Sequence, residues 1–183
     1  MKVKRTAIPD VVVIEPEVFR DSRGYFLETW NEVAFKGATG VNLRFVQDNQ
    51  ARSRRFVVRG LHYQLHRPQG KLVRATRGRI FDVAVDLRRS SHTFSKWVGV
   101  ELSGDSHRQV WIPPGFAHGY LVLSDEADVA YKVTDYYAAE WERTIAWNDV
   151  DLNIAWPLSH GTQPILSVKD AAGGTFVATD TFI

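Results

Sequence analysis

Apolar and polar residues alternate with a period of two along most of the chain, which predicts short β-strands rather than helices. In residues 80–87, one face carries Phe81 and the three apolar residues at 83, 85 and 87, whereas Asp82 and Asp86 lie on the other face. This alternation predicts a half-buried strand. Residues 129–134 alternate likewise, with Val129, Tyr131 and Val133 on one face.

Similar short patterns recur along the sequence, separated by turn-forming residues such as Ser22-Arg23-Gly24 and Pro113-Pro114-Gly115. Only residues 31–36, with Asn31 as a possible N-cap, and residues 138–142 have the character of short helical turns. No linker, charge block or repeat divides the chain. We therefore expect one all-β domain over residues 1–183, a sandwich or barrel. Further strands are expected at residues 11–16, 25–30, 45–51, 57–64, 73–76, 96–102, 109–112, 119–123 and 145–147.

The composition of the chain excludes several kinds of catalytic and binding site. The chain has 183 residues and no cysteine, which excludes disulfides, thiol nucleophiles, iron–sulfur clusters and cysteine-ligated zinc. A net charge of +2 is too small to indicate nucleic acid as a partner. The basic N-terminus is not followed by an apolar run long enough for a signal peptide or a membrane span. We expect a soluble cytoplasmic protein that binds neither membrane nor nucleic acid.

The common nucleotide and hydrolase motifs are absent. No Gly-x-Gly-x-x-Gly follows a strand, Gly70-Lys71 lacks the upstream glycine of a P-loop, and neither Gly-x-Ser-x-Gly nor His-Glu-x-x-His occurs. An anionic ligand would therefore be held by Arg and Lys side chains or by irregular backbone.

Two segments contain histidines at positions that can be compared with the metal-binding motifs of cupin barrels. Residues 111–119 contain a Pro-x-Gly-x-x-His step ending at His118, which resembles the second motif of cupin barrels. The first cupin motif normally supplies His-x-His, but here Gln64 stands where the second ligand of His62 belongs, and His66 is about 13 Å further along a strand. We therefore expect no metal.

Without a metal, His62 is suited to acid–base work near neutral pH. A lone strand histidine is more often a core residue, as Tyr131 is more often core and Lys71 more often a surface charge. Arg59 and Lys71 nearby change that balance, because buried cations need an anionic ligand or carboxylates.

The whole chain, from about residue 6 to residue 170, resembles the dTDP-4-dehydrorhamnose 3,5-epimerases, cupin-fold sugar-nucleotide epimerases of L-rhamnose biosynthesis. The resemblance implies a cupin-type β-barrel or jelly roll with short peripheral helices, a homodimer, and no cofactor. The segments that carry it are residues 6–11, 21–28, 45–49, 59–64, 70–74, 81–86, 111–119, 131–137, 147–149 and 167–170.

The resemblance also implies roles for single residues. The base falls on His62, its partner carboxylate on Asp170, the proton-donating tyrosine on Tyr131, and the lysine beside the sugar carbonyl on Lys71. Ala51 stands where a serine is common, which could loosen one phosphate or sugar contact. The positions implied to bind the substrate are Arg23, Phe26, Glu28, Gln47, Asp48, Asn49, Arg59, His118, Glu142 and Lys169, of which Arg23, Phe26 and Glu28 would act across the dimer. Tyr137 is our candidate for stacking on the base, which needs a flat apolar surface.

These residues suit the implied reaction, inversion of C3 and C5 beside a C4 ketone. Both carbons are α to one carbonyl, so one enolate-stabilising cation serves both proton transfers. Three alternatives stay open: a monofunctional 3- or 5-epimerase of antibiotic deoxysugar biosynthesis, a metal-dependent cupin, and a non-catalytic sugar-nucleotide binding module.

Overall fold

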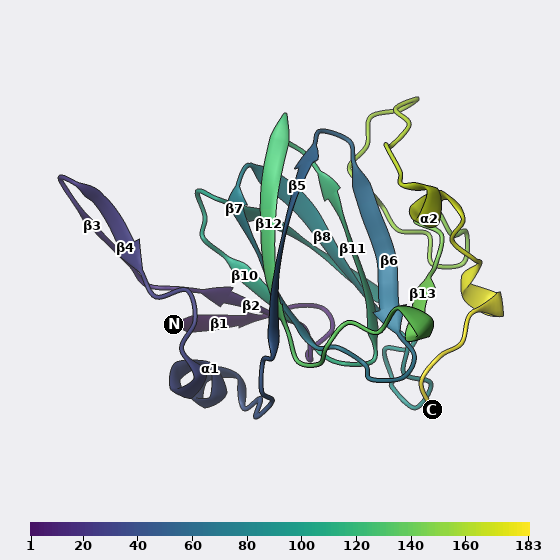
Figure 1. Cartoon of the computed structure of the whole chain (residues 1–183), viewed down its shortest axis with the longest axis horizontal. Helices are drawn as coiled ribbons and strands as arrows, with labels where there is room; N and C mark the ends of the chain where they lie inside the picture. The colour runs from purple at the N-terminus through teal and green to yellow at the C-terminus, as the bar shows by residue number, and fades with distance from the viewer.

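Two antiparallel sheets pack face to face, and a two-stranded hairpin projects from one side (Figure 1). The computed structural model describes all 183 residues. One sheet has the order β1-β2-β10-β7-β12-β5 and the other β13-β6-β11-β8-β9, while β3 and β4 form the hairpin. This jelly-roll arrangement with few helices confirms the predicted fold class. No helix is long and apolar enough to cross a lipid bilayer.

The elements follow one another closely along the chain. Their bounds are β1 (Lys2–Arg5), β2 (Val12–Glu15), β3 (Val18–Asp21), β4 (Gly24–Leu27), α1 (Glu32–Thr39), β5 (Gln47–Arg54), β6 (Val58–Gln64), β7 (Lys71–Arg77), β8 (Arg79–Asp86), β9 (Trp97–Ser103), β10 (Gln109–Ile112), β11 (Phe116–Val122), β12 (Glu126–Val133), the 3₁₀ turn η1 (Ala139–Trp141), β13 (Glu142–Thr144), α2 (Val168–Ala171) and the 3₁₀ turn η2 (Phe176–Ala178).

Most predicted elements are present, with shifted ends. The helical turn predicted at 31–36 is the start of α1, and Asn31 caps it by accepting a hydrogen bond from the Ala34 N–H at 3.0 Å. The strand predicted at 145–147 is wrong: β13 lies three residues earlier, at Glu142–Thr144. Strands β1 and β3 were not predicted, because their residues are mostly charged and exposed.

The prediction of a half-buried strand at residues 80–87 is also wrong, because β8 is buried on both faces. It lies between β11 and β9, with Ile80 and Ala84 in the core between the sheets. Its other face packs against the C-terminal segment, including Phe182. Asp82 and Asp86 are only 2% and 0% exposed. These carboxylates tolerate burial because side-chain donors satisfy them.

Strands β6 and β11 approach each other unusually closely where they carry the histidines. A Cβ on Gly60 would lie 2.6 Å from the Gly119 Cα, so a side chain at residue 60 would force the strands apart. Gly60 also has φ +120°, which favours glycine. One step along this pairing, His62 is the register partner of His118.

Candidate active site

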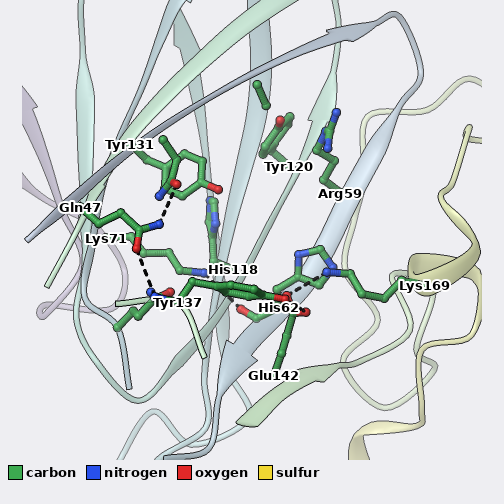
Figure 2. A pocket seen from close by; sticks show the side chains of 13 residues that line it. Gln47, Arg59, His62, Lys71, His118, Tyr120, Tyr131, Tyr137, Glu142 and Lys169 are labelled. Carbon is green, nitrogen blue, oxygen red and sulfur yellow. Dashed lines mark hydrogen bonds and ion pairs between the residues drawn. The ribbon is translucent and has the colours of Figure 1, made fainter. Parts of the chain in front are cut away.

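A cavity of about 320 Å³ opens between the two sheets and collects side chains from both of them (Figure 2). The six-stranded sheet supplies residues of β5, β7 and β12, and the five-stranded sheet supplies residues of β6, β11 and β13. Its lining is mostly polar. The residues are Gln47, Asn49, Ala51, Arg59, His62, Gln69, Lys71, His118, Tyr120, Tyr131, Tyr137, Glu142 and Lys169.

His62 is held by a buried carboxylate from the far end of the chain. Its Nε2 lies 2.6 Å from Oδ1 of Asp170, on α2. The Gly60 N–H and the Ser167 hydroxyl also donate to this carboxylate, at 3.2 and 2.6 Å. Burial alone would raise the pKa of Asp170, but the hydrogen bonds from His62 and Ser167 lower it to about 2. An ionised Asp170 accepts the Nε2–H of His62 and leaves Nδ1 as the nitrogen that can take a proton.

His62 itself is neutral at ordinary pH. Burial lowers its pKa, and the positive charge of Lys169 acts in the same direction, while the bond to Asp170 opposes them. A neutral imidazole with an oriented ring is the form that a general base requires.

Lys71 is a buried ammonium without a carboxylate partner. The side chain is 8% exposed, and its one hydrogen bond, at 3.4 Å, goes to the His62 carbonyl oxygen. Burial lowers its pKa to about 8, and the charges of Asp82 and Glu142 only partly offset this. A cation in this position would be stabilised by a negatively charged or strongly polarised oxygen in the cavity.

Tyr131 reaches the cavity from the sheet opposite His62 (Figure 2). Burial raises the pKa of its phenol, with the charge of Arg59 opposing, so the hydroxyl stays protonated. The cavity thus presents a base on one side and a hydroxyl donor on the other.

The mouth of the cavity is held in place by a chain of polar contacts. Lys169 Nζ donates to Glu142 Oε1 at 2.8 Å, and the Tyr137 hydroxyl donates to Glu142 Oε2 at 2.9 Å. The Tyr137 N–H donates to Gln47 Oε1 at 3.2 Å, and Gln47 Nε2 donates to Asn49 Oδ1 at 2.8 Å. Burial would raise the pKa of Glu142, but the bonds from Lys169 and Tyr137 lower it, so Glu142 is a carboxylate.

Most residues predicted for the site therefore meet in one place, and five do not line this cavity. One of them, Asp170, still contacts the site through its hydrogen bond with His62, whereas Arg23, Phe26, Glu28 and Asp48 do not. Arg23 and Phe26 lie on the β3–β4 hairpin, away from the sheets (Figure 1), with Arg23 paired to Asp21 at 2.6 Å. Glu28 accepts a hydrogen bond from Asn31 Nδ2, and Asp48 pairs with Lys132 at 2.8 Å. That Arg23, Phe26 and Glu28 serve a partner's site stays a prediction.

Two lining residues, Gln69 and Tyr120, were not singled out from the sequence, and a third, Ala51, was noted only as a departure from the family pattern. Gln69 lies in a loop two residues before Lys71, outside any strand, so strand periodicity does not place its side chain. Tyr120 lies two residues after His118 on β11, and Ala51 two after Asn49 on β5. Side chains two apart on a strand share a face, so the period-two rule could have found both.

The side chains considered for a metal are engaged otherwise. His118 Nε2 lies 2.8 Å from Asp82 Oδ2, and no group of three or more His, Cys, Asp or Glu side chains is arranged to hold a metal ion. The Gln64 side chain instead forms hydrogen bonds with two loops: its Nε2 donates to the Arg67 carbonyl, and its Oε1 accepts from the Ala138 N–H. His66 lies beyond the end of β6 and packs on Trp141.

The known proteins that this chain resembles in sequence and structure are epimerases of dTDP-linked sugars. Residues 5–177 match the family model described as dTDP-4-dehydrorhamnose 3,5-epimerase. A dTDP-4-dehydrorhamnose 3,5-epimerase of Pseudomonas aeruginosa is 57% identical over 182 residues, covering 100% of this chain and 99% of that protein. A dTDP-6-deoxy-D-glucose-3,5-epimerase of Legionella pneumophila, solved with dTDP-4-keto-L-rhamnose, is 49% identical with a TM-score of 0.94, covering 98% of this chain and 94% of that chain. An epimerase that acts at a single carbon has a similar structure. This 3'-monoepimerase of Streptomyces bikiniensis, solved with dTDP-quinovose, is 32% identical with a TM-score of 0.87, covering 97% of this chain and 88% of that chain.

Proposed function

Because the chain belongs to the dTDP-4-dehydrorhamnose 3,5-epimerase family, we propose that it inverts C3 and C5 of dTDP-4-dehydro-6-deoxy-D-glucose to give dTDP-4-dehydro-L-rhamnose. The observation that carries the proposal is the geometry of the cavity. A carboxylate-oriented histidine and a protonated tyrosine come from opposite sheets, and an unpaired lysine lies in the same cavity. This arrangement supports proton transfer at carbons next to a ketone.

In the first half of each inversion, His62 Nδ1 takes the proton from the carbon next to the C4 ketone. The electron pair of the broken C–H bond moves into the carbonyl, whose oxygen becomes an enolate. Lys71 stabilises that charge, which is larger in the transition state than in the bound ketone. Asp170 keeps the ring in the required tautomer and stabilises the imidazolium that forms.

In the second half, the enolate carbon takes a proton from the opposite face of the ring. Tyr131 supplies it from the sheet opposite His62, and the enolate electrons return to the carbon as the ketone re-forms. The tyrosinate and the imidazolium then exchange protons with solvent. No oxidation state changes, and the same groups act on C3 and C5 in turn because both carbons flank one carbonyl.

The charged part of the substrate matches the residues at the mouth. Arg59 and Lys169 place two cations where a diphosphate would lie, and guanidinium groups suit phosphate oxygens because they can bind two at once. Tyr137 is 54% exposed and offers a flat ring on which a nucleobase can stack.

We further propose that the enzyme is a homodimer in which the β3–β4 hairpin reaches the partner's site. The hairpin exposes the aromatic rings of Phe19, Tyr25 and Phe26, which are costly to leave in water without a covering surface. Mixing the inactive variants His62→Ala and Arg23→Ala tests this. If Arg23 acts across the dimer, mixed dimers contain one intact site and activity returns; absence of recovery would place Arg23 outside the partner's site.

The reaction is tested by incubating the enzyme with dTDP-4-dehydro-6-deoxy-D-glucose in D₂O. Deuterium should appear at both C3 and C5, and His62→Ala should abolish both labels while the protein stays folded. Label at neither carbon would refute an epimerase and favour a binding module. The similarity to a 3'-monoepimerase favours one second candidate, a monofunctional epimerase, which would introduce label at a single carbon. Metal analysis of the purified protein tests the metal-dependent alternative.

A further inference from the structure

The hydroxyl of Tyr120 is the single buried side-chain polar atom without a hydrogen-bond partner in the structure. Tyr120 is 3% exposed and lines the cavity. An unpaired hydroxyl in a dry interior is costly, whereas a phenylalanine ring would fill nearly the same space at no such cost. A tyrosine in this position therefore calls for a partner that the folded chain does not supply.

The neighbouring residues do not satisfy this hydroxyl. Arg59 is the register partner of Tyr120 across β6 and β11, but its Nε donates to Ser53 Oγ at 2.9 Å. Ser53 lies close enough to lower the pKa of the Tyr120 phenol, in opposition to burial, but no hydrogen bond of acceptable geometry joins the two hydroxyls. Ala51, which also lines the cavity, carries no polar side-chain atom. In Figure 2, Tyr120 lies between Tyr131 and Arg59.

The depth of Tyr120 in the cavity indicates which part of a ligand it would meet. Like Tyr120, Lys71 and His118 are deeply buried, at 8% and 7% exposed, and these three form the floor. Tyr137 and Lys169 are about half exposed and form the mouth. The floor suits a neutral sugar ring, whereas the charged diphosphate and the base belong at the mouth, where desolvation costs less.

We propose that the Tyr120 hydroxyl donates a hydrogen bond to an oxygen of the bound sugar ring and thereby determines specificity for the sugar. The inference rests on the proposed function, since it assumes a sugar nucleotide in the cavity. The hydroxyl is suited to donate because burial raises the pKa of Tyr120 to about 12, so it keeps its proton throughout the working range of an enzyme.

The variant Tyr120→Phe removes only the hydroxyl oxygen and leaves the packing of the ring intact. We expect kcat/KM for dTDP-4-dehydro-6-deoxy-D-glucose to fall about 3- to 10-fold, the effect of one neutral hydrogen bond. The dissociation constant of dTDP, which lacks the sugar, should not change. The melting temperature of the unliganded variant should equal or exceed that of the wild type, because a buried unpaired group is gone.

Tyr63→Phe is the matched control. The Tyr63 hydroxyl also lies in the interior but donates to the Asp180 carbonyl, outside the cavity. This variant should lose thermal stability and keep its kcat/KM.

Three outcomes would overturn the proposal. If Tyr120→Phe keeps the wild-type kcat/KM, the hydroxyl has no role in binding the sugar. If the dissociation constant of dTDP rises by the same factor by which kcat/KM falls, the hydroxyl contacts the nucleotide diphosphate instead. If the wild type itself fails to turn the substrate over, the proposed function is wrong, and this assignment fails with it; the wild-type assay separates that case from the other two.

Discussion

Replacing Lys71 with methionine should stabilise the protein while nearly abolishing its activity. The ammonium is buried without a carboxylate partner, and burial lowers its pKa from 10.5 to about 8. A shift of this size corresponds to about 3 kcal/mol of penalty on the charged form in the folded state. Methionine has a similar length and no charge, so Lys71→Met should raise the free energy of unfolding at pH 7 by about 2–3 kcal/mol.

The pH dependence makes this prediction specific. Below pH 8 the lysine is charged in both the folded and the unfolded state, and the wild type carries the whole penalty. Between pH 8 and 10.5 the unfolded chain binds more protons than the folded one, so wild-type stability rises with pH. Above pH 10.5 the lysine is neutral in both states. The advantage of Lys71→Met should therefore shrink from pH 8 upward and vanish near pH 10.5.

Urea unfolding followed by tryptophan fluorescence measures the difference at pH 7 and pH 10.5, and kcat/KM is measured in parallel. Loss of the charge that stabilises the enolate should lower kcat/KM by about 10²- to 10³-fold. Lys132→Met is the control: Lys132 pairs with Asp48 at 2.8 Å, and a partly exposed pair contributes about 0–1 kcal/mol. A variant at residue 71 that is less stable than the wild type at pH 7, or equally favoured at both pH values, would refute the reasoning.

Three further outcomes follow from the site and the fold. In the pH profile, kcat/KM should fall above about pH 8, where Lys71 loses its proton. The acid limb should have its midpoint below pH 6.5, because burial lowers the pKa of His62. A midpoint at or above pH 6.5 would exclude His62 as the base. Asp170→Asn should lower kcat by roughly 10³- to 10⁴-fold, since an amide does not select the His62 tautomer, and steady-state kinetics on folded protein should detect it. Asp86→Ala should cost about 3–5 kcal/mol in urea unfolding, because Asp86 is fully buried and accepts from Arg88, Ser91 and Thr93; a loss below 1 kcal/mol would contradict this.

The strand pattern predicted most of the two sheets, but it could not predict which polar residues are buried. Gln109–Ile112 was predicted to the residue, because apolar side chains mark it on both faces. In β8 the same rule failed, since Asp82 and Asp86 alternate like solvent-facing residues. Asp82 pairs with His118, 36 residues away, and Asp86 is satisfied by residues of the loop that follows β8; the period-two pattern carries no information about either set of partners.

In the candidate site too, the local sequence pattern predicted some features and could not predict others. Histidine and lysine on apolar strands indicated a buried polar cavity, yet nothing local connects His62 with Asp170, which lies 108 residues further along the chain. Only the resemblance to a family paired them. Tyr120, by contrast, follows from strand geometry once His118 is placed, and was missed because an aromatic residue in a strand is usually core.

The position of Asp170 on the C-terminal segment has a consequence for the order in which the enzyme is completed. This segment returns to the barrel through parallel bridges that join Ile165 to Val57 and Phe182 to Arg88, and it covers one face of β8. A barrel whose last segment has not docked would hold His62 without its carboxylate and would lack Lys169 at the mouth. Turnover therefore reports that this segment has docked, and chains in which it is missing or undocked should be inert towards the substrate.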